Sequence, residues 1–275
     1  MSPTPAALQR NITLTYLSLA LKEAMFILPV LVAFYQLRGV SLADFFLIQA
    51  LFRLVMAFLQ LPLSYWADFS QRRRQIQLGA GAWLLGVLLL WWGHGFWVVL
   101  TAELLFGISI ALWYSNSECL VFESLKARGQ TKQHLKVLGR QRTLGSAFAT
   151  VAMGIGGWLF TQDADLPITL TALFSALALL FTLGLVEAPR AMQAKPKNPW
   201  RDFVTTFRYM GHGHPEILWL SLWPGITAAT GACLFWSLQP IATQGGMSFS
   251  ALGVWLFGYY VVRTLFAASM STLTN

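Results

Sequence analysis

The stretch that decides the fold is residues 61–77, LPLSYWADFSQRRRQIQ, which lies between two long apolar segments. It contains one acid, Asp68, followed after a short gap by the consecutive arginines Arg72, Arg73 and Arg74. A segment this polar does not remain in lipid, and basic residues gather in the cytoplasmic loops of membrane proteins. We therefore predict a cytoplasmic turn between two membrane helices.

The composition predicts the same class of protein. Of the 275 residues, 56% are hydrophobic and only 11% are charged, whereas an average soluble domain carries about 25% charged residues. Apolar runs long enough to cross a bilayer recur along the chain. We expect an all-α, polytopic transmembrane helical bundle with the lipid bilayer as a partner. The formal net charge of +8 comes from basic loops and indicates membrane orientation, so we expect no nucleic-acid partner.

Eight membrane helices are expected, at residues 12–37, 42–66, 76–92, 96–120, 143–160, 168–186, 217–241 and 249 to the chain end. With a cytoplasmic N-terminus, nearly every loop lysine and arginine lies on the cytoplasmic side, as the positive-inside rule requires. The opposite loops then hold Arg38, Asp44, His94, Asp163 and Asp165. These features predict a multi-pass protein of the cytoplasmic (plasma or inner) membrane.

The longest connection suggests a division of the chain into three parts. Residues 1–187 form a six-helix transmembrane half, 188–215 a cytoplasmic linker, and 216–275 two further membrane helices. Within the linker, Trp200, Phe203, Val204 and Phe207 recur at helical spacing. This pattern indicates a short helix lying in the membrane interface, although a solvated linker fits equally well.

The turn at Asp68 resembles a motif of the major facilitator superfamily of secondary transporters. In that family the loop between helices 2 and 3 has the form Gly-x-x-x-Asp-Arg-x-Gly-Arg-Arg/Lys. Asp68 and the pair Arg72-Arg73 fit this form, whereas Ser64, Phe69 and Gln71 depart from it.

Two further helices can be compared with the family. The segment Glu103 to Gly107 keeps the spacing of a family Arg-x-x-x-Gly motif but reverses its charge. The expected helix 143–160 contains Gly145, Gly154, Gly156 and Gly157, similar to the glycine-rich helix 5 of the family's antiporters. Ordinary close packing of helices explains these glycines equally well.

The resemblance implies two six-helix halves, about 12 helices in all, that move around a site at the membrane midplane. With about eight helices, this chain resembles a C-terminally truncated member of the family. The similar spacing of Ser41 to Arg53 and of Ser250 to Arg263 suggests a repeat between the halves. The implied function is secondary active transport of a small molecule by alternating access, coupled to H⁺ as an antiporter or a symporter, with export favoured. The alternative is a transport-incompetent fragment or a membrane interaction protein.

Ionisable residues within membrane helices are costly and are candidates for function. Glu23, Arg53 and Arg263 are expected near mid-depth, and Glu103 farther toward the outer side. We predict that these four residues couple protons or substrate, with a Glu23–Arg53 ion pair that protonation of Glu23 would break. A permanent structural ion pair fits equally well.

Other charges are expected at the inner face. We predict salt bridges there for Glu118 and Glu123, with partners such as Arg142 and the arginine triplet. The resemblance implies that Asp68, Arg72 and Arg73 brace the outward-facing state.

The sequence contains no motif typical of an enzyme, a cofactor or a metal site, and we predict none of these. His212 and His214 alone are too few ligands to indicate a metal. Five aromatic residues could line a cavity for an organic substrate, although packing against lipid explains them as well: Trp113, Tyr114, Trp219, Trp223 and Trp236.

Overall fold

The computed structural model describes residues 3–189, 205, 208 and 215–273. The chain divides into two compact units, one formed by Met1–Met192 with Met247–Asn275 and the other by Gln193–Gly246. The four residues of the expected interfacial helix, and the two linker histidines, lie outside the described residues. The described part of the second unit is mainly the helix α9 (Pro215–Gln244), which carries exposed Trp219, Trp223 and Ile241.

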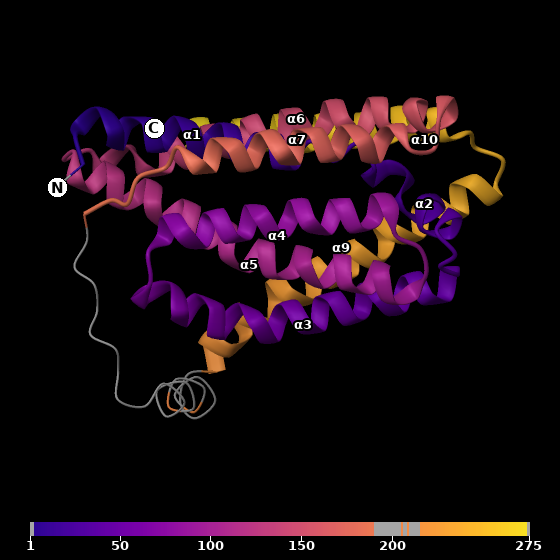
Figure 1. The fold of residues 1–275 in the computed structure, drawn as a ribbon, viewed down its shortest axis with the longest axis horizontal. Helices are drawn as coiled ribbons and strands as arrows, with labels where there is room; N and C mark the ends of the chain where they lie inside the picture. Colours follow the sequence, from indigo (N-terminus) through magenta and orange to yellow (C-terminus); the bar gives the residue numbers. More distant parts are fainter. Residues whose placement is uncertain (1–2, 190–204, 206–207, 209–214, 274–275) are drawn as a thin grey trace. The chain divides into compact units, whose positions relative to one another are not determined.

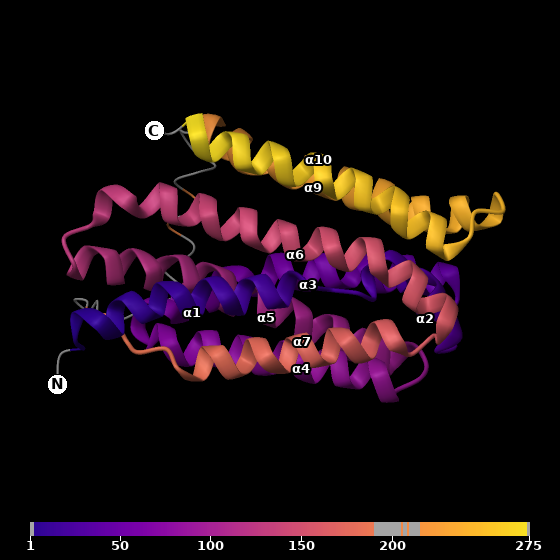
Figure 2. The ribbon, with the colours of Figure 1, turned by 90° about the horizontal axis from the view of Figure 1, so that it is seen from above.

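The helices of the first unit form two layers that run along a common direction (Figures 1 and 2). One layer contains α3 (Leu42–Phe69), α5 (Phe96–Ala127) and α4 (Arg72–Trp92), in that order. The other contains α10 (Phe249–Leu273), α6 (His134–Gln162), α1 (Pro5–Glu23) and α7 (Leu166–Leu183). Contacts of α4 with α7 and of α1 with α5 join the two layers.

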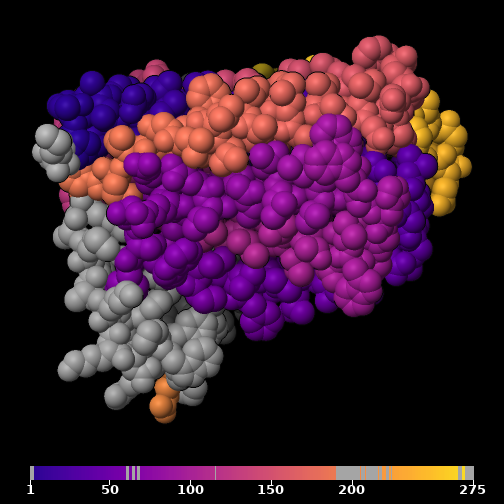
Figure 3. Space-filling view, in the orientation of Figure 1, coloured from indigo at the N-terminus to yellow at the C-terminus, as the bar shows by residue number. Residues whose placement is uncertain are grey.

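The prediction of an all-helical chain with segments able to span a membrane is confirmed for the described residues. Six helical segments are long and apolar enough to cross a membrane: Pro5–Leu37, Leu42–Leu59, Arg72–Trp92, Phe96–Ala127, Thr131–Gln162 and Leu166–Leu183. Figure 3 shows α7 lying along α4 on one face of the unit. Exposed leucines of these two helices include Leu78, Leu85, Leu173 and Leu180. An apolar surface of this kind is suited to lipid rather than to water.

Several helices extend beyond their expected ends. α3 continues to Phe69 and α4 begins at Arg72, so the connection between them is only two residues long. The expected basic loop before residue 143 is largely helical, because the short helix η2 (Thr131–Gln133) leads directly into α6. Apolar runs mark only the part of a helix that lies in lipid, whereas backbone hydrogen bonding continues into the polar turns at each end.

The first membrane segment is interrupted, whereas the sequence suggested one continuous helix. α1 ends at Glu23, and the chain resumes as η1 (Leu28–Val30) and α2 (Leu31–Leu37). Pro29 accounts for the break, because proline lacks an N–H for the carbonyl four residues earlier and disfavours helix at the preceding residue. The freed N–H of Ile27 donates instead to the hydroxyl of Thr171 on α7, at 3.3 Å.

Two glycines of α6 allow other segments to approach closely. A Cβ atom at Gly156 would overlap the carbonyl oxygen of Phe26, within the break of the first segment. A Cβ atom at Gly157 would overlap the carbonyl oxygen of Phe249 at the start of α10. Close helix packing through small residues is common in membrane bundles, and here it fixes α6 against both neighbours.

The helix starts at α3 and α10 have the same local geometry. Ser41 caps α3 by accepting from the N–H of Asp44 at 3.1 Å, and Ser248 accepts from the N–H of Ala251 at 3.2 Å. Two residues before each cap lies a glycine with positive φ, Gly39 at 81° and Gly246 at 86°. Counted from these caps, Arg53 follows Ser41 by 12 residues and Arg263 follows Ser248 by 15, so the two arginines lie at different positions along their helices.

The contact at Gly156 can be tested by mutation. Gly156→Ala should lower the free energy of unfolding by about 1–3 kcal/mol, because the added methyl group overpacks a site with a backbone oxygen in the way. Gly81→Ala in α4 is the matched control, since a Cβ there meets nothing within 4 Å and alanine favours helix. Thermal unfolding in detergent compares them, and equal melting temperatures for both variants would contradict the close approach.

Candidate functional site

The interrupted first segment brings two ionisable residues to the junction of the two layers. Lys22 is only 4% exposed, and its Nζ lies 3.7 Å from the ring centroid of Trp83 and 4.4 Å from that of Tyr114. These distances are typical of cation–π contacts. Lys22 is also in the last turn of α1, where the helix dipole favours a positive charge.

A phenol links this lysine to the neighbouring acid. The hydroxyl of Tyr114 lies 3.4 Å from Lys22 Nζ and donates a hydrogen bond to the carboxylate of Glu23. We call these three residues the Lys22–Tyr114–Glu23 triad. Its members come from α1 and α5, so the triad connects the two layers directly beside the break in the first segment.

A cavity of about 390 Å³ opens next to the triad. Its walls come from α1, α5, α6 and α10, with lining residues Leu19, Glu23, Tyr114, Glu118, Leu138, Gln141, Arg142, Gly145, Ser146 and Arg263. The ion pair between Glu118 and Arg142 forms its more exposed part, at 3.2 Å and with side chains 40% and 71% exposed. The volume suits a small molecule.

Glu103 lies elsewhere and does not line this cavity. Its Oε1 accepts from the Tyr35 hydroxyl at 2.6 Å and from Gln49 Nε2 at 2.8 Å. All three side chains are buried, at the meeting of α2, α3 and α5. Two neutral donors on one buried carboxylate form a compact polar link that fastens α2 and α3 to α5.

The expected ion pair between Glu23 and Arg53 is wrong. Glu23 is on α1 and is bonded by Tyr114, whereas Arg53 is exposed on α3 with its guanidinium 5.5 Å from the ring of Phe52. Similar depth in a membrane does not place two helices side by side. α1 and α3 lie in different layers and both pack against α5, which separates them.

The arginine triplet forms the first turn of α4, where positive charge opposes the helix dipole. An acid from after α7 offsets this, because the Glu187 carboxylate accepts from the backbone N–H groups of Arg72 and Arg73, both at 3.0 Å. The Arg72 side chain donates to Glu123 at 2.8 Å and to Asn116 at 3.3 Å. Arg72 therefore joins α4 to α5.

The other charged residues expected nearby fall into two groups. The predicted ion pairs of Glu118 and Glu123 are present, with Arg142 and Arg72 as their partners. Arg73 and Arg74 have exposed side chains. Asp68 lies in the last turn of α3.

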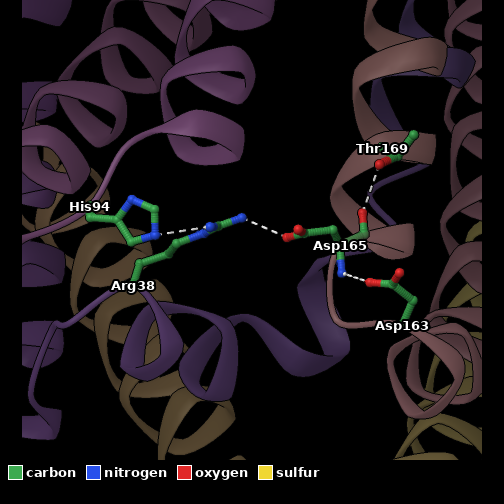
Figure 4. Close-up of polar contacts among 5 residues, drawn as sticks. All are labelled: Arg38, His94, Asp163, Asp165 and Thr169. Atoms are coloured by element: carbon green, nitrogen blue, oxygen red, sulfur yellow. Dashed lines mark hydrogen bonds and ion pairs between the residues drawn. The ribbon is translucent and has the colours of Figure 1, made fainter.

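Three of the residues predicted in the loops opposite to the cytoplasmic side lie together: Arg38, His94 and Asp165 (Figure 4). Arg38 donates to Asp165 at 2.5 Å and to His94 Nε2 at 3.1 Å. The Asp163 carboxylate accepts from the N–H of Asp165 at 2.8 Å. Arg38 thus ties the turn after α2 to the α4–α5 and α6–α7 turns.

Sequence reasoning missed several residues of these clusters. Trp83 carried no signal, because one more aromatic in an apolar helix is ordinary. Glu187 and Asn116 were assigned no role, although an acid just after a membrane helix is a candidate partner for a basic turn. Pro29 was the readable signal for the break, since proline interrupts helices.

The comparisons with known proteins give no family. A scan against protein-family models finds no match, and a search of the curated proteins finds none either. Among the described residues, no group of three or more His, Cys, Asp or Glu side chains could hold a metal ion. The described arrangement can hold a small molecule in the cavity, beside the Glu23 carboxylate.

The role of Arg72 leads to a testable difference within the triplet. Arg72→Ala should lower the free energy of unfolding by about 1–3 kcal/mol, because Glu123 loses a charged hydrogen-bond partner. Arg74→Ala removes the same charge from an exposed position and should change stability by less than about 0.5 kcal/mol. Thermal unfolding in detergent measures both, and a larger effect for Arg74→Ala would refute this assignment.

Proposed function

We propose that this protein is a proton-coupled secondary transporter that moves a small molecule across the cytoplasmic membrane by alternating access. The observation that carries the proposal is the interrupted first segment, with the Lys22–Tyr114–Glu23 triad beside the cavity. Interrupted helices with ionisable groups near mid-depth are typical of substrate and ion sites in transporters.

Non-helical backbone within a membrane is tolerated only where protein or a water-filled cavity satisfies its polar groups. Here Thr171 serves the N–H of Ile27. A continuous helix would be more stable for simple anchoring, because it satisfies its own hydrogen bonds. The break therefore favours a role that needs local rearrangement.

In this proposal Glu23 carries the proton. Protonation removes its negative charge and leaves the neighbouring Lys22 ammonium without the acid that Tyr114 links to it. Burial of an uncompensated charge is costly, so the packing of α1 against α5 would change with the proton. Glu103 is buried and accepts hydrogen bonds from Tyr35 and Gln49, and we assign it to packing.

Membership of the major facilitator superfamily is part of the proposal. Its support is the position of Asp68, Arg72 and Arg73 between the second and third membrane segments, and the shared cap geometry of α3 and α10. We place the N-terminus and the arginine triplet in the cytoplasm, on the positive-inside rule.

A flux assay tests this function. Purified protein in liposomes that contain a trapped fluorescent pH indicator is exposed to a library of small metabolites, one at a time. At least one compound should change the internal pH, with acidification indicating symport and alkalinisation antiport. Glu23→Gln should abolish this response, because the glutamine cannot exchange a proton.

Two variants serve as comparisons. Glu103→Gln should retain coupled flux, and Asp44→Asn, at a half-buried acid in the first turn of α3, should match the unmodified protein. Undiminished flux in Glu23→Gln would reject Glu23 as the carrier. Absence of any response in the unmodified protein would favour the transport-incompetent alternative.

A further inference from the structure

The charges around the cavity do not balance within the described residues. Two sets are neutral in themselves. The triad joins the Lys22 ammonium to the Glu23 carboxylate through Tyr114. The second set is the ion pair of Glu118 and Arg142. This leaves Arg263, which also lines the cavity.

Arg263 comes from the middle of α10 and has no ion pair with a carboxylate in the part of the chain that the structure describes. Its guanidinium lies 5.1 Å from the ring centroid of Tyr260. The Arg263 side chain is exposed at the cavity, so its positive charge is open to a ligand. A bound anion would supply the opposite charge, and the planar guanidinium fork matches a carboxylate with two parallel hydrogen bonds.

The neighbouring wall fits the same type of ligand. Gln141 and Ser146 of α6 are uncharged polar residues, and Ser146 Oγ lies 2.6 Å from Thr264 Oγ1 beside Arg263. Leu19 and Leu138 add apolar surface. The cavity thus combines an unbalanced cation with polar groups and an apolar wall.

We propose that this cavity binds a small organic anion through its carboxylate, with Arg263 as the principal recognition residue. The inference rests on the proposed transport function and names its substrate class. The carboxylate pairs with the guanidinium, and the organic part packs against the leucines. Glu23 lines the same cavity and would repel a second negative charge on the ligand, so monoanions are preferred to dianions.

Ligand-induced thermal stabilisation of the purified protein in neutral detergent tests this inference without any transport. The probes are acetate, lactate and benzoate, the neutral amides of the same acids, and the cation benzylammonium. At least one carboxylate should raise the melting temperature in a concentration-dependent way, whereas its amide and the cation should not. Stabilisation by benzylammonium alone, or by none of the carboxylates, would overturn the proposal.

Substitutions locate the effect. Arg263→Gln should weaken the apparent affinity for the stabilising carboxylate on the order of tenfold or more, and Arg263→Lys should retain part of it. Arg53→Gln is the matched control, because it removes another membrane arginine that does not line the cavity. Equal affinity in Arg263→Gln and Arg53→Gln would reject the site. If Arg263→Gln does not fold, the Arg263→Lys affinity and the carboxylate–amide comparison decide.

Anionic phospholipid offers the same charge from another source, so phosphatidylglycerol is added in a separate arm. Stabilisation through Arg263 by this lipid, with no effect of soluble carboxylates, would replace a substrate site with a lipid site and contradict the proposal. Carboxylate binding without coupled flux in liposomes would contradict the transport function and leave the anion site standing. Coupled flux of neutral or cationic compounds alone would contradict the anion site and leave the transport function standing.

Discussion

The hydrogen bond from Tyr114 to Glu23 is the contact on which the centre of the bundle depends. It places a neutral hydroxyl between a buried ammonium and its neighbouring carboxylate, so neither charge is isolated in apolar surroundings. The aromatic face of Trp83 covers Lys22 from another helix. Because α1 and α5 belong to different layers, the Tyr114 hydroxyl both links the two charges and holds the two helices together. A change in the charge of Glu23 would therefore affect the charge balance and the helix packing.

The break in the first segment exists because other helices accommodate it. Pro29 interrupts the backbone pattern, Thr171 satisfies the Ile27 N–H, and Gly156 leaves room for the Phe26 carbonyl. Polar links at the two ends, around Arg72 and around Arg38, hold the connecting turns. The unit is therefore held together at both ends and has a polar group of side chains at its centre.

Much of the fold could be predicted from the sequence, because long apolar segments between basic turns specify membrane helices. The ion pairs of Glu118 and Glu123 also followed from the expected place of both acids at the inner end of a helix, near the basic loops. The predicted ion pair of Glu23 with Arg53, which is wrong, shows what the sequence does not provide. Counting residues along a helix gives the depth of a side chain in the membrane, but only packing determines which helices are neighbours. The spacing from Ser250 to Arg263 did not reveal the helix start either, because the cap of α10 is Ser248, which follows a glycine turn.

The central claim is that Glu23 exchanges a proton within the triad, and infrared difference spectroscopy tests it without knowledge of the substrate. Reconstituted protein is taken from alkaline to acidic pH while the carbonyl stretch of protonated carboxyl groups is recorded. The account predicts a band that Glu23→Gln removes, that Glu103→Gln leaves in place and that Tyr114→Phe shifts by loss of its hydrogen bond. Superimposable spectra of the unmodified protein and Glu23→Gln over the whole pH range would contradict it.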